Sequence, residues 1–113
     1  MNTVSLIGNL ATDVELREVG PDKKVAGFLL AIQRGPDDAD FVWVSAWDRQ
    51  AETCADYLAK GNRVAVAGRL RSRSWEEEGK RRNAVEVVAH RVEFLSPPSA
   101  EAEVPFEAAA VRA

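Results

Sequence analysis

The sequence predicts an all-β fold, a small closed antiparallel barrel of five strands with one short helix between the third and fourth strands. Two observations support this prediction. Apolar and polar residues alternate with a period of two over most of residues 3–95, which is the pattern of strands with one buried face. A single stretch, residues 49–61, changes to helical spacing, and short turns rich in glycine, proline and acidic residues separate the strands.

The N-terminal half holds the first strand segments, which cover residues 3–10, 13–19, 25–33 and 41–47. The first two segments count as one strand, so that three strands precede the helix. We expect the first of them to loosen near Gly8 and Asn9, because glycine inside a strand has no side chain to pack. Two stretches punctuated by proline and glycine separate later segments. Residues 20–24, "GPDKK", are expected to form a turn, and residues 34–40, "RGPDDAD", a short acidic loop.

The helix is predicted from apolar residues that recur three and four positions apart within residues 49–61. Lys60 and Gly61 predict its end, because a basic last turn followed by glycine is a common helix stop. This is the one helix that the pattern predicts.

Strand alternation returns after the helix, along residues 62–75. The core face of this strand is expected to carry Val64, Val66, Gly68 and Leu70, and the opposite face Arg63, Ala65, Ala67, Arg69, Arg71, Arg73 and Trp75. Residues 76–80 predict a hairpin tip, and residues 84–95 predict the last strand.

Residues 40–48, "DFVWVSAWD", carry three of the eight aromatic residues of the chain. Successive side chains of an extended strand point to opposite faces. One face therefore carries Phe41, Trp43, Ser45 and Trp47, and the other Val42, Val44 and Ala46. The small apolar set suits the core, so the large rings are expected to lie outside it.

Rings on one strand and arginines on another predict binding of single-stranded nucleic acid. Bases stack on aromatic side chains with about 1–3 kcal/mol each, whatever the base, and guanidinium groups pair with phosphates. Duplex DNA exposes no base faces to such rings. Two ordinary alternatives stay open: strand aromatics often pack in a core or a subunit interface, and arginines on an alternate face are often solvated.

The composition is that of one globular domain of 113 residues, with 46% hydrophobic and 29% charged residues. The net charge of −3 is unevenly spread, since residues 60–95 hold nine basic and five acidic residues. The single cysteine permits no internal disulfide, and neither a secretory signal nor a membrane-spanning apolar run is recognised. We therefore expect a cytoplasmic protein.

Five ordered motifs give the chain a family resemblance that runs from about Asn2 to Leu95. They are "SLIGNL", "VSAWD", "ADYLAKG", "VAVAGRLRSRSW" and "RVEFL", and together they resemble the bacterial single-stranded DNA-binding proteins. The resemblance implies an OB-fold barrel, a homotetramer and sequence-tolerant binding of single-stranded DNA in replication, recombination or repair. It also implies a nucleoid-associated location in the cytoplasm, and it implies neither an enzyme nor a cofactor.

The resemblance also implies roles for single residues. Trp47 and Phe41 match base-stacking positions, and Trp75 matches the tryptophan that follows the basic strand of the family. Arg71 and Arg73 match phosphate-contacting positions, and Tyr57 matches a helix tyrosine for which packing is at least as good an explanation. The full candidate set for single-stranded DNA is Phe41, Trp43, Trp47, Arg63, Arg69, Arg71, Arg73, Trp75, Arg17, Arg49 and Tyr57.

The chain departs from the family pattern at three places. Trp43 stands where a basic or polar residue is more usual, and residues 34–40 are shorter and more acidic than the usual loop. The acidic run 76–78 follows Trp75, where it would repel phosphate unless it points away. We therefore expect one stacking site to be missing from the loop, and the affinity or the footprint to differ.

Residues 1–95 are expected to form the binding domain and residues 96–113 a mobile acidic tail. The tail contains "EAEVPF", which resembles the acidic Pro-Phe tip by which the family docks replication and repair proteins. Phe106 is followed by seven further residues, so it has no terminal carboxylate to dock. A chance match of these six residues is an open alternative.

Two other functions stay as alternatives. A replication-restart or protein-docking module would keep the barrel and bind DNA weakly. A nuclease would need convergent metal ligands or a placed acid and base. The lone His90 and Cys54 are better explained as structural residues, and the acidic residues 37–40 as a solvated loop.

Overall fold

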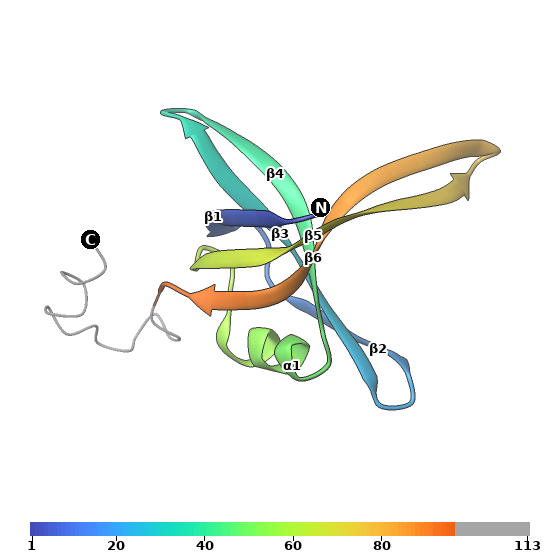
Figure 1. Ribbon diagram of the computed structural model, residues 1–113, viewed down its shortest axis with the longest axis horizontal. Helices are drawn as coiled ribbons and strands as arrows, with labels where there is room; N and C mark the ends of the chain where they lie inside the picture. The colour runs from blue at the N-terminus through green and yellow to red at the C-terminus, as the bar shows by residue number, and fades with distance from the viewer. Residues whose placement is uncertain (97–113) are drawn as a thin grey trace, which may run out of the picture.

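The computed structural model describes residues 1–96, which form six strands and one helix (Figure 1). The strands are β1 (Val4–Leu10), β2 (Glu15–Gly20), β3 (Lys23–Gly35), β4 (Asp38–Trp47), β5 (Arg63–Glu77) and β6 (Lys80–Phe94). The helix α1 (Asp48–Tyr57) lies between β4 and β5. These residues contain no helix long and apolar enough to cross a membrane.

Five of the strands close into a ring in the order β1-β5-β6-β4-β3. The ring closes where the end of β1 pairs with β3, at Asn9 with Ala31 and Leu10 with Leu30. The predicted antiparallel arrangement is wrong for one pair of strands, since β4 pairs with β6 in parallel; the other pairings are antiparallel. The five-stranded OB-fold barrel is confirmed, with its helix between the third and fourth strands of the ring. The segment β2 is a sixth strand, which pairs with β3 outside the ring.

The core is filled by the aliphatic faces of the strands around the fully buried Phe28. Val44 and Ala46 are buried, as predicted for the small face of β4, whereas Phe41 on the other face is 59% exposed. The helix α1 packs against β3 and β4 and contributes the buried Ala51 and Cys54 to the same core. Burial of this apolar surface is the main force that holds the barrel together.

Two glycines allow strands to approach each other more closely than any side chain would permit. A Cβ atom at Gly8 would lie 2.3 Å from the carbonyl oxygen of Ala31, where β1 crosses to β3 and closes the ring. A Cβ atom at Gly68 would lie 2.1 Å from the carbonyl oxygen of Val88. Gly68 lies at the irregularity that leaves His90 of β6 without a partner in the register of the ladder.

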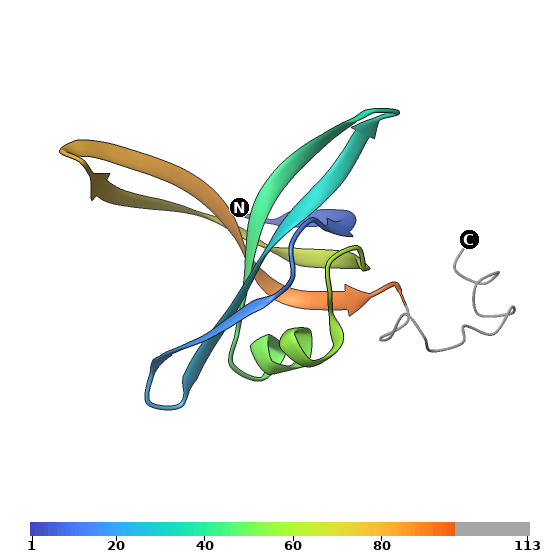
Figure 2. The same ribbon diagram turned by 180° about the vertical axis from the view of Figure 1, so that it is seen from behind.

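Three hairpins extend beyond the barrel as arms, formed by β2 with β3, β3 with β4, and β5 with β6 (Figures 1 and 2). All residues from Arg69 to Asn83 in the β5–β6 arm are exposed. Leu70 was predicted to face the core, but it is 44% exposed because β5 has already left the barrel at that point.

The predicted loop at residues 34–40 and the predicted end of the helix are wrong. The ladder between β3 and β4 continues to Gly35 and Asp38, so only Pro36 and Asp37 lie between the two strands. The helix ends at Tyr57, because Leu58 takes an extended conformation with φ −106° and ψ 145°. Gly61 does have a positive φ of 95°, but it serves the turn before β5.

Candidate nucleic-acid interface

A groove of about 390 Å³ lies where β4, β5 and β6 meet the β2–β3 hairpin. It brings together five of the residues that the sequence predicts for single-stranded DNA: Arg17, Trp43, Trp47, Arg71 and Arg73. These residues come from β2, β4 and β5, so the barrel has to close before they lie together.

The two tryptophans of the groove lie on one face of β4, with the buried Ser45 between them. Trp43 is 50% exposed, and Trp47 is half-buried opposite Val25 of β3. Four strand positions separate their Cα atoms by about 13 Å. That is too far to clamp one flat base, so each indole offers its own stacking surface.

Arg71 and Arg73 of β5 both bond Glu86 on the neighbouring strand β6. Arg71 donates from Nη2 to Glu86 Oε2 at 2.5 Å, and Arg73 donates from Nη1 to Glu86 Oε1 at 3.5 Å. The Arg73 guanidinium also lies 5.6 Å from the ring centre of Trp75, which is a cation–π distance. Both arginines remain about half exposed and can still meet a phosphate.

Glu86 is a buried groove residue that sequence analysis missed. Its side chain is only 8% exposed, on the groove floor between two arginines and the β4 strand. The signal in the sequence was a single acidic residue inside the apolar run "AVEVVA". A lone carboxylate in such a run has to find cationic partners, because an unpaired buried charge is very costly.

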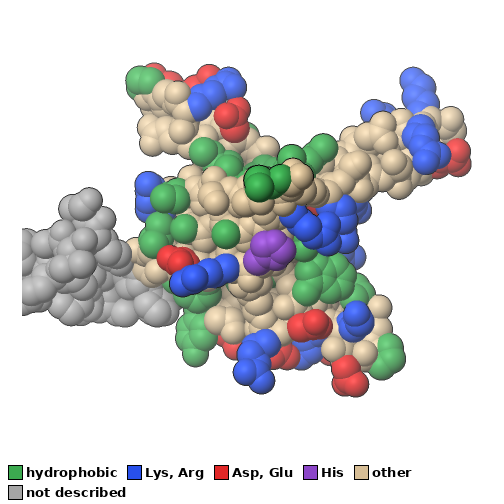
Figure 3. Space-filling view, viewed as in Figure 1, with side chains coloured by type: hydrophobic (Ala, Val, Ile, Leu, Met, Phe, Trp, Pro, Cys, Tyr) green, Lys and Arg blue, Asp and Glu red, His purple; other side chains and the backbone are tan. Residues whose placement is uncertain are grey.

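The outer part of the β5–β6 arm places acidic residues opposite basic ones. Glu76 pairs in register with Arg81, and Glu77 with Lys80. Arg82 also lies 3.5 Å from Glu77, between Nε and Oε1. Glu76 and Glu77 of the acidic run after Trp75 therefore lie opposite cations on β6, and basic side chains gather at the end of this arm in Figure 3.

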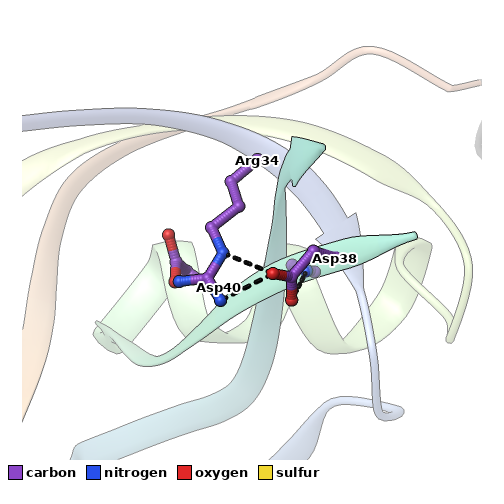
Figure 4. Close-up of polar contacts among 4 residues, drawn as sticks. Arg34, Asp38 and Asp40 are labelled. Carbon is purple, nitrogen blue, oxygen red and sulfur yellow. Dashed lines mark hydrogen bonds and ion pairs between the residues drawn. The ribbon is translucent and has the colours of Figure 1, made fainter. Parts of the chain in front are cut away.

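The β3–β4 arm ends in an ion-pair cluster that is built around Arg34 (Figure 4). Its Nη2 lies 2.7 Å from Asp38 Oδ2, and its Nη1 lies 2.9 Å from Asp40 Oδ1. One cation is thus held by two carboxylates of the same hairpin. The tip is short and acidic, as the sequence predicts, although it is a strand end and not a loop.

The remaining candidates lie outside the groove. Phe41 and Trp75 are exposed on the β3–β4 and β5–β6 arms, and Arg69 is exposed at the base of the latter. Arg63 lies at the other end of β5 and bonds Asn9 Oδ1 at 3.3 Å.

The two candidates on the helix do not line the groove either. Tyr57 packs against Phe94, with ring centres 6.5 Å apart, which favours the packing role that was left open for it. Arg49 lies in the first turn of α1 and donates no side-chain hydrogen bond within residues 1–96 that would fix it toward the groove.

The groups with a shifted pKa do not line the groove. Hydrogen bonding and charge attraction between Lys24 and Glu52, 2.5 Å apart, raise the pKa of Lys24 and lower the pKa of Glu52. Burial raises the pKa of the Cys54 thiol to about 11. No cluster of three His, Cys, Asp or Glu residues suited to a metal ion occurs in the part of the chain that the structure describes.

Comparison with known proteins gives a consistent assignment. A model of the single-strand binding protein family matches residues 1–95. The chain is 43% identical over 102 residues to a single-stranded DNA-binding protein of Clostridium tetani, covering 84% of this chain and 70% of that protein. It is 42% identical over 104 residues to one of Bacillus cereus, covering 86% and 61%. Another, from Halalkalibacterium halodurans, is 39% identical over 110 residues, covering 91% and 66%.

This chain therefore spans between 61% and 70% of the length of these three relatives. The match covers the whole barrel with its helix, and it confirms the resemblance that the five sequence motifs indicate. The chain belongs to the single-strand binding protein family.

Proposed function

We propose that this chain binds single-stranded DNA by stacking bases on the indoles of Trp43 and Trp47 and pairing phosphates with Arg17, Arg71 and Arg73. The observation that carries this proposal is the groove, which collects flat rings and guanidinium groups from three strands. Curated relatives at about 40% identity are named single-stranded DNA-binding proteins, which supports the same function.

Stacking makes this groove selective for single strands. An exposed base gains about 1–3 kcal/mol from each ring, but a paired base in a duplex has no free face to offer. The rings do not depend on the identity of the base, so we expect little sequence preference. Such binding serves to protect single strands in replication, recombination or repair, and it needs no cofactor and no catalytic step.

The exposed aromatics extend the proposed path of the strand beyond the groove. Phe41 lies on the same face of β4 as Trp43, toward the tip of the β3–β4 arm. Trp75 lies beyond Arg73 on the β5–β6 arm. We propose that both rings stack further bases, and that Arg69, Arg81 and Arg82 contact phosphates beside them.

We further propose that the chain forms a homo-oligomer, most simply a homotetramer. One edge of β1 pairs with β5, whereas its other edge pairs with β3 only at Asn9 and Leu10. The free edge over residues 4–8 can pair with a second copy, since an unpaired edge is a ready template for another strand. Ile7, which is 51% exposed beside this edge, would lose solvent contact on pairing.

Residues 1–95 are proposed as the binding domain and residues 96–113 as a mobile acidic tail that carries at most a weak docking site for replication and repair proteins. Residues 97–113 lie outside the described part of the chain. The tail proposal therefore depends on the sequence alone.

Equilibrium titration tests the proposed function directly. Labelled single-stranded and duplex oligonucleotides of the same length are titrated with the full chain over a range of salt concentrations. We expect much tighter binding of the single strand, with an affinity that falls as salt rises because phosphate contacts release counterions. Equal affinity for the two forms would contradict the proposal.

A further inference from the structure

The floor of the groove holds a carboxylate, although the ligand proposed for the groove is a polyanion. Glu86 lines the groove together with Arg71 and Arg73, and its side chain is only 8% exposed. Each of its two oxygens accepts from one of these arginines, at 2.5 Å and 3.5 Å. It pairs in register with Trp43 of β4, so it also lies beside a proposed stacking ring.

Glu86 changes the charge that the groove presents to a phosphate. Three arginines and two glutamates line the groove, and Glu15 is the other, exposed glutamate. Glu86 is the carboxylate held between arginines, so it cancels positive charge close to where a phosphate would pair. A carboxylate about 6 Å from a phosphate opposes binding by an amount that grows as solvent is excluded.

We propose that Glu86 is a specificity-determining residue that weakens the general attraction of the groove for phosphate and so favours single strands over duplex DNA. This inference rests on the proposed function. Duplex DNA binds to such a surface through its phosphates alone, with a higher charge density than a single strand. A single strand also gains from base stacking on Trp43 and Trp47, which the carboxylate does not reduce.

Neutral replacements of Glu86 test the inference. Glu86→Gln keeps the length of the side chain and one acceptor oxygen, and Glu86→Met keeps the length without any polar atom. Glu52→Gln is the control, because Glu52 also pairs with a cation, Lys24, and neither Glu52 nor Lys24 lines the groove. All three remove one negative charge from the chain, so a difference among them reports position and not net charge.

Each variant is titrated with single-stranded and duplex oligonucleotides of equal length from low to high salt, alongside the unchanged chain and with melting curves to verify folding. We expect either Glu86 variant to bind the single strand roughly three- to tenfold more tightly at low salt. The slope of log affinity against log salt should steepen by up to about 0.7, the value for one further phosphate neutralised on a single strand. Duplex affinity should rise more, so that single-strand preference falls by about twofold or more. Glu52→Gln should leave the preference unchanged.

The inference is overturned if the Glu86 variants match Glu52→Gln in slope and preference, if they bind the single strand more weakly, or if neither neutral variant folds. In the last case the carboxylate would be needed for the fold and not for selectivity. Failure of the proposed function would give a different result: the chain without any substitution would itself show no preference for single strands.

Discussion

Trp43 and Trp47 are the residues on which the proposed binding depends most. Replacing either of them with alanine removes one stacking surface worth about 1–3 kcal/mol, so we expect the affinity for oligo-dT to fall roughly five- to 150-fold. Trp75→Ala on the β5–β6 arm should act in the same direction. Binding is measured by fluorescence anisotropy of a labelled oligonucleotide.

Tyr57→Leu is the matched control, since Tyr57 is an exposed aromatic residue that contacts Phe94 and not the groove. It should leave DNA affinity unchanged. If Trp47→Ala lowers the melting temperature strongly and leaves affinity intact, that indole belongs to the core.

The thiol of Cys54 should be inert in the folded chain. Cys54 is fully buried, and burial raises the pKa of the thiol from 9.0 to about 11, so almost no thiolate exists at neutral pH. We expect iodoacetamide to react much more slowly with the native chain than with the chain in denaturant. Because the thiol ionises at lower pH in the unfolded chain, its contribution to stability is lost as pH rises from about 9 to 11. Equal alkylation rates in the two states would contradict this placement.

At the residue scale, sequence alternation predicted most of the side chains that leave the core, with Leu70 and Ser45 as exceptions, but not which of them meet. The exposed rings and arginines followed from a period of two, because that period is set by backbone geometry. Their grouping depends on which strands become neighbours when the ring closes. Arg63 shares a strand face with Arg71 and Arg73, yet it lies at the other end of β5 beside Asn9.

At the scale of elements, Gly8 is the residue that allows β1 to close the barrel. A Cβ atom added there would lie 2.3 Å from the backbone oxygen of Ala31, which no rotamer change can relieve. We expect Gly8→Ala to lower the free energy of unfolding by about 1–3 kcal/mol or more, as measured by urea denaturation.

Gly20→Ala provides the control for that prediction, because nothing lies within 4 Å of a Cβ atom at Gly20. This variant should stay within about 0.5 kcal/mol of the unchanged chain. Equal losses in the two variants would mean that backbone entropy, and not contact with β3, decides the cost at Gly8.

The strand and helix types could be predicted from the sequence, whereas their ends could not. Residues 34–40 contain proline, glycine and three aspartates, which favour a loop, but the ladder of β3 and β4 and the ion pairs of Arg34 extend the hairpin to its tip. The helix stops at Tyr57, before Lys60 and Gly61, because Leu58 turns into the core in an extended conformation. Tertiary contacts decide where both elements end, and a local sequence pattern carries no information on such contacts.

At the scale of the whole molecule, the free edge of β1 predicts self-association. We expect light scattering at micromolar concentration to give the mass of a homo-oligomer, most simply four chains of 12.4 kDa each. Ile7→Lys should shift the distribution toward smaller species, because it places a charge beside the proposed strand-pairing edge. A monomer mass for the unchanged chain would contradict the proposed assembly.

The tail should modulate binding only weakly. It carries three glutamates and one arginine, and a tethered anionic segment competes with phosphate for a basic surface. Deletion of residues 97–113 should leave single-strand affinity unchanged or slightly higher, with the gain lost at high salt.

Truncation after Phe106 should improve binding of the partner proteins of the family if these proteins dock on a free Pro-Phe carboxylate. No improvement would mean that "EAEVPF" is not a docking tip that the following residues disable.

The central claim is that bases, and not only phosphates, bind the groove. Its most direct test is the intrinsic tryptophan fluorescence of the chain on titration with oligo-dT and with an abasic oligonucleotide of the same length, at the same salt concentration. The two ligands carry equal phosphate charge and differ only in having bases to stack. We predict strong quenching and much tighter binding with oligo-dT, and weak binding with little quenching for the abasic strand. Equal affinity and equal fluorescence change for the two would contradict the claim.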